Sequence, residues 1–281
     1  MEKISAFIIC KNEETVIGQA LESLKWSDEI IVIDGKSTDR TLEICRSYTS
    51  KIFQRDWTNF GEQRNFALEK TSHPWVFYLD ADEVCSQELI VFFEKFRANG
   101  LKGVLPMTKP SPSLHPMALL GEENQNKDLN SQIDLIEVRR IEHFKGRPYY
   151  FGATNPSHQW RFFRREGAKF SGDVHEFVVV RGQILRLEAP IYHYPRADLT
   201  QMFSKMNRYS TLEAEQLFKK NIVHRAPYMF FSGLAMFTKS YFRKQGFRDG
   251  VLGFIFSVMD ASGFFLRQAK LYLLNRGAKR I

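Results

Sequence analysis

The chain has 281 residues, of which 43% are hydrophobic and 14% aromatic, enough for the core of one large domain or of one domain with an appendage. Its three cysteines form no CxxC pair, and the odd number argues against a disulfide framework and favours a reducing cytoplasm. The N-terminal apolar run is too short for a signal peptide, and no run approaches the length of an uncharged spanning segment, so a conventional spanning helix is not expected.

The net charge of +8 is concentrated near the C-terminus. Residues 225–281 hold 10 of the 40 lysines and arginines but only two of the 32 acidic residues, Asp249 and Asp260, so the rest of the chain is balanced. A basic segment of this kind can bind phosphate, either on nucleic acid or on anionic lipid. The residues that accompany the charge must decide between the two.

Residues 1–100 alternate strand and helix patterns. Buried-strand runs are predicted at residues 4–10, 29–34, 51–55 and 75–82. Helical spacing is predicted between them at residues 13–26, 37–48 and 61–71. This alternation is typical of an α/β fold, in which helices sandwich a mainly parallel sheet.

Polar residues close three of these predicted strands. In open sheets of this class, ligands bind outside the carboxyl ends of the strands. The polar and turn residues found at those ends are Lys11, Asn12, Glu13, Asp34, Gly35, Lys36, Asp80 and Asp82. We therefore expect a ligand site at this edge of the sheet.

The stretch FYLDADEV, residues 77–84, ends a hydrophobic strand in clustered negative charge. Side chains two apart on a strand point to the same side, so Asp80 and Asp82 would repel unless a positive charge lies between them. A divalent cation such as Mg²⁺ takes oxygen ligands and leaves positions free for phosphate oxygens. The alternative is a solvated turn that happens to be acidic.

The pattern changes after residue 105. Residues 106–130 are rich in Pro, Ser, Asn and charge and read as a loop. Strand character returns at residues 133–144, 158–165, 175–182 and 184–194. Helices are predicted at residues 198–220, 227–245 and 249–275.

The sequence has neither a GxxxxGK[ST] nor a GxGxxG phosphate loop. Its stretches VIDGKSTDRT (32–41), QRN (63–65) and DAD (80–82) resemble those of inverting family-2 glycosyltransferases of the GT-A fold. The likeness is greatest to the lipopolysaccharide-core glucosyltransferases. It covers residues 1–90 strongly and continues more loosely through WRFFRR (160–165), GDVHEFV (172–178) and the basic, aromatic C-terminal helices.

The resemblance implies a GT-A catalytic domain over residues 1–197, with a nucleotide-sugar-binding half at 1–100 and an acceptor and catalytic half at 131–197. A helical, membrane-associating region follows at 198–281. The donor would be a nucleotide-diphospho-sugar, most often a UDP-sugar. The residues implied in donor binding are Lys11, Asn12, Glu13, Asp34, Arg64, Asn65, Asp80, Arg161, Arg164 and His175.

Within that set, the resemblance assigns Asp34 to the nucleoside and Asp80 to the ribose or the sugar. Asp82, with Asp80, would hold Mg²⁺ or Mn²⁺ against the diphosphate, where the metal neutralises charge on the leaving group. Many relatives carry two acids where this sequence has Asp34 and Gly35. The alternative for Asp34 is a turn aspartate that precedes a helix.

An inverting transfer needs a carboxylate that takes the proton of the acceptor hydroxyl. The stretch FSGDVHEF, residues 170–177, offers Asp173, His175 and Glu176. The family's His-Glu dipeptide falls at this place, so the resemblance makes Glu176 the base, with Asp173 as the second candidate. The alternative is an acidic loop before a strand. Among the arginines of WRFFRR, one would clamp the diphosphate, because Arg matches phosphate oxygens bidentately.

The C-terminal region mixes large apolar residues with cations at helical intervals. Aromatic and aliphatic side chains at Phe230, Phe231, Leu234 and Phe237 share one helical face, and lysine and arginine follow at residues 239–244. Such a helix is expected to lie in the interface of an anionic membrane, as a peripheral attachment at the cytoplasmic face of the inner membrane. Nucleic acid is disfavoured, because the cations alternate with aliphatic bulk. The alternative is a helical hairpin packed on the catalytic domain or on a second subunit of a homo-oligomer.

The sequence thus predicts a metal-dependent, inverting glycosyltransferase that acts on a lipid-linked or lipopolysaccharide-core glycan. One alternative is a sugar nucleotidyltransferase, although that class would show a Gly-rich, basic stretch after the first strand, and the first glycine here is Gly18. Another is a membrane-attached adaptor that keeps the fold without catalysis.

Overall fold

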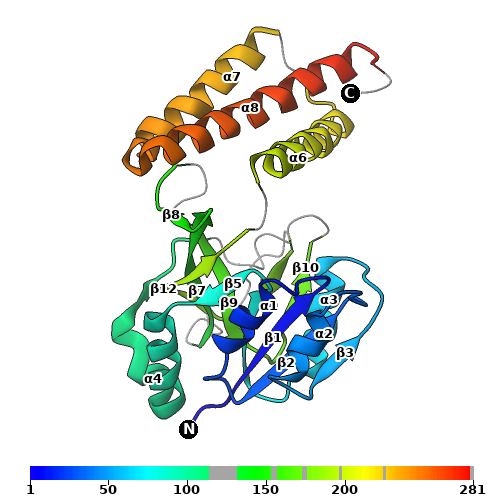
Figure 1. Cartoon of the computed structure of the whole chain (residues 1–281). Helices are drawn as coiled ribbons and strands as arrows, with labels where there is room; N and C mark the ends of the chain where they lie inside the picture. Colours follow the sequence, from blue (N-terminus) through cyan, green and yellow to red (C-terminus); the bar gives the residue numbers. More distant parts are fainter. Residues whose placement is uncertain (114–131, 153–156, 173–175, 196–197, 224–225, 279–281) are drawn as a thin grey trace. The chain divides into compact units, whose positions relative to one another are not determined.

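The structure is a computed structural model of the chain (Figure 1). It describes all residues except 114–131, 153–156, 173–175, 196–197, 224–225 and 279–281. The chain divides into two compact units. The first, which we call the sheet unit, comprises residues 1–141 and 157–194, and the second, the helical unit, comprises residues 142–156 and 195–281. That residues 1–197 form one domain and residues 198–281 a separate region stays a prediction.

The sheet unit is built on one large sheet with the strand order β3-β2-β1-β4-β9-β7-β12-β5. Its strands are β1 (Ile4–Cys10), β2 (Glu29–Asp34), β3 (Ile52–Gln54), β4 (Trp75–Asp80), β5 (Glu83–Cys85), β6 (Thr108–Pro110), β7 (Ile133–Phe144), β9 (Ser157–Arg164) and β12 (Gln183–His193). The short strand β8 (Arg147–Tyr149), which pairs with the end of β7, lies within the residues of the helical unit. A separate hairpin pairs β10 (Lys169–Ser171) with β11 (Phe177–Val179). The helices are α1 (Ile17–Glu22), α2 (Thr41–Arg46), α3 (Phe60–Lys70) and α4 (Gln87–Val104), with a 3₁₀ turn, η1 (Leu105–Met107).

The predicted α/β class is confirmed, and its parallel part is formed by β3, β2, β1 and β4. The strands that come later in the chain pair antiparallel, beginning with β9 against β4. The first three predicted helices are present but differ in length, since α1 and α2 cover only the middle of the predicted ranges. Helix α4 was not predicted.

Two apolar layers lie on opposite faces of the sheet. Alternate residues of β1 belong to different layers: Ile4 and Ile8 face one, and Phe7 and Ile9 face the other. The first layer is covered by residues of α1, α2 and α4, and the second by residues of α3 and the β10–β11 hairpin. Because both faces are covered, β1 is buried along its whole length, as expected for a central parallel strand.

Besides β8, the helical unit contains α6 (Leu199–Lys219), α7 (Ala226–Thr238), a π-helical turn η3 (Lys239–Arg243), a 3₁₀ turn η4 (Gly246–Asp249) and α8 (Gly250–Asn275). Asp198 caps α6 in a capping box with Gln201. The buried Lys270 of α8 donates from Nζ to several oxygens of α6, including Oγ of Ser210 at 2.8 Å. At Gly233, an added Cβ would lie 3.3 Å from Cβ of Phe265, so this glycine permits the close approach of α7 and α8.

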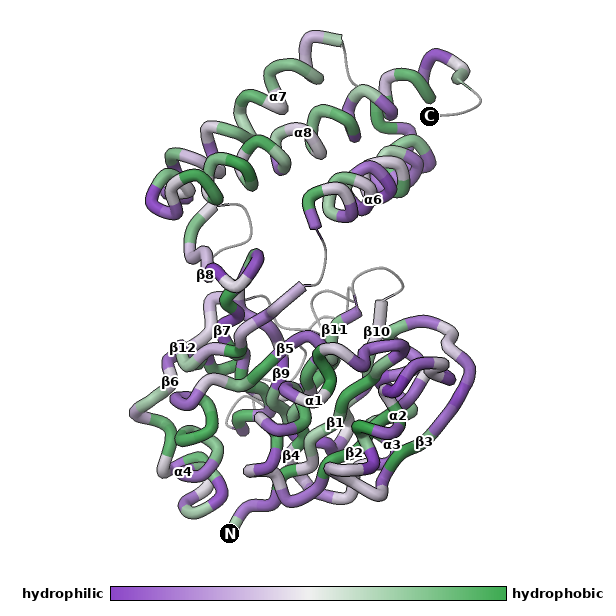
Figure 2. The backbone as a smooth tube through the Cα atoms, viewed as in Figure 1, coloured by the Kyte–Doolittle hydropathy of each residue, from purple (hydrophilic) through white to green (hydrophobic). Residues whose placement is uncertain are grey.

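Much of the apolar surface of the helical unit is exposed. Figure 2 shows hydrophobic residues along α7 and α8, whereas α6 carries more hydrophilic ones. The segment Gly246–Asn275 is long and apolar enough to cross a membrane, by length and composition, and 17% of its most apolar window is buried. The sequence reading expected no such helix. Some core helices of soluble proteins have the same length and composition, but they are mostly buried.

Candidate active site

The register of the parallel strands brings the predicted site residues to one edge of the sheet. Cys10 at the end of β1 lies opposite Asp34 at the end of β2. On the other side of β1, Ile9 lies opposite Asp80 at the end of β4. The carboxyl ends of three strands therefore meet, as predicted, and the loops that follow them surround the same edge.

Asp34 is fully buried and held by its own turn. Its Oδ2 accepts hydrogen bonds from the Ser37 backbone N–H at 3.0 Å and from Nε2 of Gln54 at 2.9 Å. This is the geometry of the alternative considered for Asp34, a turn aspartate before a helix. Its contact with a nucleoside stays a prediction.

Gly35, where many relatives are expected to carry a second acid, is shielded by Trp57. An added Cβ at this position would lie 2.9 Å from Cε3 of Trp57 and 3.2 Å from Cβ of Lys11. The indole ring thus occupies the space that a side chain at residue 35 would need. This contact gives a steric reason for the departure from the family pattern.

The residues that follow β1 form hydrogen bonds between the loop after β1 and the loop after β2. Asn12 has a left-handed backbone with φ of 57°, and its Oδ1 accepts from the Thr38 backbone N–H at 2.8 Å. The Glu13 backbone N–H donates to Oγ1 of Thr41 at 2.7 Å. Asn12 and Glu13 therefore hold the loop after β1 against the loop after β2, while Lys11 beside them is exposed.

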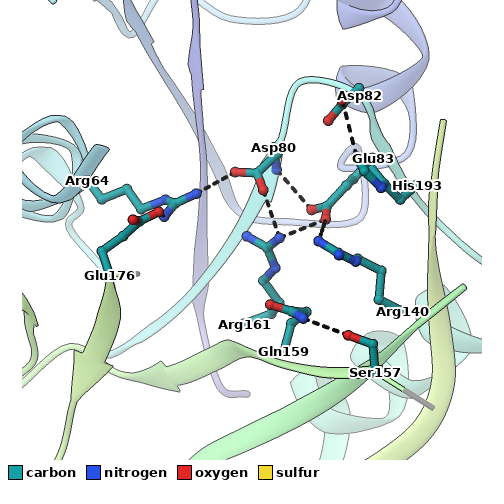
Figure 3. A network of polar contacts seen from close by, with 10 residues as sticks. All are labelled: Arg64, Asp80, Asp82, Glu83, Arg140, Ser157, Gln159, Arg161, Glu176 and His193. Atoms are coloured by element: carbon teal, nitrogen blue, oxygen red, sulfur yellow. Dashed lines mark hydrogen bonds and ion pairs between the residues drawn. The ribbon is translucent and has the colours of Figure 1, made fainter. Parts of the chain in front are cut away.

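Asp80 lies at the centre of a network of charged side chains, and its own side chain is 29% exposed (Figure 3). Its Oδ1 accepts from Nη2 of Arg64 at 2.7 Å, and its Oδ2 accepts from Nη2 of Arg161 at 2.8 Å. Burial alone would raise the pKa of Asp80, but the two guanidinium groups more than offset it and hold the pKa well below its usual range. Asp80 is therefore ionised, and both of its oxygens are engaged by arginine.

The side chain of Glu83 points into the same network, a placement that was not predicted from the sequence. Its Oε1 accepts from Nη2 of Arg161 at 2.7 Å, and Nη1 of Arg140 lies 3.6 Å away. Its Oε2 accepts from the Asp80 backbone N–H at 3.0 Å. Burial raises the pKa of Glu83, an effect that the charge of Arg161 opposes. The sequence signal that could have found it is the spacing of Asp80 and Glu83, three apart in a tight turn.

Asp82 lies outside this network and faces His193. Oδ2 of Asp82 is 3.2 Å from Nε2 of His193, and the two side chains are 31% and 19% exposed. The Tyr194 backbone N–H also donates to the carbonyl oxygen of Asp82 at 2.8 Å. Both acids predicted to bind metal are partly exposed, Asp82 at 31% and Asp80 at 29%, but both oxygens of Asp80 accept from arginine whereas Oδ2 of Asp82 faces His193.

A divalent cation fits Asp82 and His193 as a pair of protein ligands. Within the part of the chain that the structure describes, no group of three or more His, Cys, Asp or Glu side chains could hold a metal. A carboxylate oxygen and an imidazole nitrogen are suitable donors for Mn²⁺, and Mg²⁺ and Mn²⁺ commonly take their remaining ligands from water and phosphate. The residues present are consistent with a site that a bound diphosphate would complete.

Arg164 is not brought to the site. Because β9 runs antiparallel to β4, Arg164 lies opposite Trp75 at the start of β4, whereas Asp80 lies at its end. Its Nε donates to the Ile133 carbonyl at 3.2 Å and lies 3.4 Å from Oδ1 of Asp134. Arg161, three residues earlier, reaches Asp80. The register of β9 therefore separates two arginines that the sequence had grouped together.

The remaining predicted residues come from α3 and from the chain before β11. Nη1 of Arg64 donates to Oε1 of Glu176, the predicted base. Asn65 exchanges two hydrogen bonds with the backbone of Phe170, at 2.8 and 2.9 Å, and so has a structural role in this geometry. Asp173 and His175 lie outside the described residues.

Comparison with known proteins places the chain in a family. The family model described as glycosyl transferase family 2 matches residues 5–114. An uncharacterized glycosyltransferase of Rickettsia typhi is 30% identical over 100% of this chain and 90% of its own length. The lipopolysaccharide core biosynthesis glycosyltransferase LpsC of Rhizobium meliloti is 29% identical over 96% of this chain and 92% of its own. The chain belongs to glycosyltransferase family 2.

Among solved structures, S. aureus TarS crystallised with UDP-GlcNAc is similar to this chain. It is 15% identical, with a TM-score of 0.45, over 99% of this chain and 93% of its own. A likeness at that level assigns no ligand or residue to this protein.

Proposed function

We propose that this family-2 glycosyltransferase moves a sugar, with inversion, from a nucleotide-diphospho-sugar to a glycan acceptor. The observation that carries the proposal is the ion-paired link from Asp80, at the end of β4, through Arg64 to Glu176. Asp82 follows Asp80 by two residues and faces His193. UDP is the nucleotide favoured by the resemblance of the strand-end motifs.

Asp82 and His193 would hold the divalent cation, either Mg²⁺ or Mn²⁺. When bound, the cation supplies Lewis-acid neutralisation of the charge that grows on the departing diphosphate. Arg161 supports the same end of the reaction, because it is 2% exposed and its Nη1 has no hydrogen-bond partner among the described residues. A buried guanidinium with an unused donor suits a phosphate oxygen.

Glu176 would act as the base. Its carboxylate takes the proton of the acceptor hydroxyl while that oxygen bonds to the anomeric carbon from the face opposite the diphosphate. The bond from the anomeric carbon to the diphosphate oxygen breaks in the same step, and the electron pair leaves with the nucleotide. Glu176 is 15% exposed, which leaves part of its side chain accessible to an acceptor.

The proposed acceptor class is supported by one relative and by the composition of the helical unit. LpsC, by its name, acts in the biosynthesis of the lipopolysaccharide core. We extend this to a lipid-linked or lipopolysaccharide-core glycan at the cytoplasmic face of the inner membrane. The basic excess of residues 225–281 and the exposed aromatic residues of α7 support peripheral attachment to anionic lipid.

The test is nucleotide release from a panel of UDP-sugars in the presence of lipopolysaccharide-core glycans and Mn²⁺. Wild-type protein should turn over, and Glu176→Gln should lower kcat by about 10²–10⁴-fold while its Kd for UDP stays close to that of wild type. Turnover by Glu176→Gln at the wild-type rate, with Asp173→Asn inactive, would move the role of base to Asp173. A wild-type protein that binds UDP but never turns over would favour the adaptor.

A further inference from the structure

Arg64 connects two carboxylates that come from different parts of the chain. We propose that Arg64 is a positioning residue, which fixes the carboxylate of Glu176 relative to Asp80, and is not a ligand of the donor diphosphate. This inference rests on the proposed function, in which Glu176 is the base. It changes the donor-binding role that the sequence motif suggested for Arg64.

Both terminal nitrogens of Arg64 are already engaged. Nη2 donates to Oδ1 of Asp80 at 2.7 Å, and Nη1 donates to Oε1 of Glu176. The side chain is only 6% exposed. A planar guanidinium can hold two carboxylates in a fixed relation, because its donors form a rigid fork. Arg161 differs in this respect, since one of its terminal nitrogens, Nη1, has no hydrogen-bond partner among the described residues, whereas in Arg64 the nitrogen without one is the inner Nε.

Aromatic rings restrict where the guanidinium can lie. Its central carbon is 4.9 Å from the ring centroid of Tyr78, 5.6 Å from that of Phe60 and 5.9 Å from that of Phe170. Cations are attracted to ring faces at these distances, and the buried rings of Tyr78 and Phe170 also leave little room for other rotamers, whereas Phe60 is 51% exposed. Arg64 is therefore held before any ligand binds.

Helix α3 also holds the chain that leads to Glu176. Asn65, next to Arg64, bonds to both backbone groups of Phe170. At the start of the same helix, an added Cβ at Gly61 would lie 3.6 Å from the Gly172 carbonyl and 3.9 Å from Cβ of Glu176. The helix thus bonds to this chain at Phe170 and at Glu176, and Gly61 leaves no side chain between the helix and Gly172.

This arrangement matters because a general base acts only within hydrogen-bond reach of its proton. A displacement of about 1 Å can lower a rate by about 10²-fold. Asp80 belongs to the strand that ends at the proposed donor site, so Arg64 ties the base to the donor side of the reaction. Loss of Arg64 should therefore reduce the chemical step more than it reduces nucleotide binding.

The experiment compares Arg64→Met and Arg64→Lys with wild type, both alone and combined with Glu176→Gln. We expect Arg64→Met to lower kcat by about 10²-fold, with the Kd for UDP within about threefold of wild type. Arg64→Lys keeps the charge but cannot fork between two carboxylates, so it should recover only part of kcat. In the Glu176→Gln background, Arg64→Met should cause little further loss, because it acts through Glu176.

Arg164→Met is the matched control, because Arg164 also pairs with a carboxylate and lies over a ring but is outside the site. It should keep kcat. A tenfold or greater rise in the UDP Kd of Arg64→Lys, with kcat retained, would overturn the inference and make Arg64 a donor ligand. Equal losses from Arg64→Met with and without Glu176→Gln would overturn it as a general structural effect. If Arg64→Met does not fold, the same comparison is made with Arg64→Lys.

A failure of the proposed function is recognised separately: if Glu176 is not the base, Glu176→Gln will keep full turnover.

Discussion

The two units use aromatic residues in opposite ways. In the sheet unit, Phe77, Phe93 and Phe162 are fully buried, and Phe93 packs edge to face against both of the others. In the helical unit, Phe230 and Phe231 of α7 are 66% and 69% exposed. The sheet unit therefore buries these aromatic side chains in its own core. The helical unit exposes its own, and an exposed apolar surface of this kind marks a site of interaction with a membrane or another protein. That contrast underlies the proposal of membrane attachment.

The largest expected difference is in folding stability. Phe162→Ala should lower the free energy of unfolding by about 3–5 kcal/mol, because it removes a ring packed against four other aromatic side chains. Phe231→Ala, the same change on α7, should alter it by less than about 0.5 kcal/mol. Urea unfolding of both variants measures the contrast. Similar losses for the two would mean that Phe231 is buried in solution and that the helical unit has another covering.

The second prediction concerns the pH dependence of folding stability that the buried carboxylate of Glu29 gives to the sheet unit. Glu29 accepts hydrogen bonds from Lys51, Ser5 and Ser72, which overcome the effect of burial and lower its pKa from 4.5 to about 2. A lowered folded-state pKa stabilises the fold above the unfolded pKa, and this contribution is lost as the pH falls from about 4.5 to about 2. The shift corresponds to about 3 kcal/mol.

Glu29→Gln should therefore destabilise the protein by up to about 3 kcal/mol at pH 7, and the difference from wild type should shrink below pH 4.5. Denaturant unfolding across pH measures this. Glu22→Gln serves as the control, because its partner Lys25 is exposed and the pair contributes little. A difference between Glu29→Gln and wild type that does not change with pH would contradict the assignment.

The third prediction concerns the helical unit. The protein should bind vesicles that contain anionic phospholipid, and high salt should weaken the binding without abolishing it, since salt screens only the charged contribution. Replacing both Phe230 and Phe231 by Ala should reduce the partition coefficient by about a hundredfold or more, because each buried phenylalanine contributes about 1.5–3 kcal/mol. Vesicle sedimentation measures it. Absence of vesicle binding together with a stable oligomer would instead make α7 and α8 a subunit interface.

Much of the sheet unit could be predicted from sequence, because its strands are continuous apolar runs separated by polar turns. The bounds of β7 agree with the predicted strand at 133–144. Helix α4 was overlooked although its signals are present: Ser86 caps it by accepting from the Leu89 backbone N–H, and Leu89, Phe92, Phe93 and Phe96 follow at helical spacing.

The site could be predicted only in part. Period-two alternation and the rule for strand ends bring Asp34 and Asp80 to one edge. The same rules cannot separate Arg161 from Arg164, because that distinction depends on the register of β9 against β4. Nor do they show that Glu83 turns inward, since its direction is set by a turn and by Arg161. Contacts between residues far apart in the sequence decide both cases.

The central claim is that a nucleotide diphosphate and a divalent cation bind beside Asp82, at the end of β4. Calorimetric titration of UDP into wild type and Asp82→Ala, with and without Mn²⁺, tests it most directly. Wild type should bind UDP more tightly with Mn²⁺, and Asp82→Ala should lose that enhancement while its unfolding free energy changes by less than about 1 kcal/mol, because the pair with His193 is partly exposed. An Asp82→Ala variant that keeps the full Mn²⁺ enhancement would contradict the account.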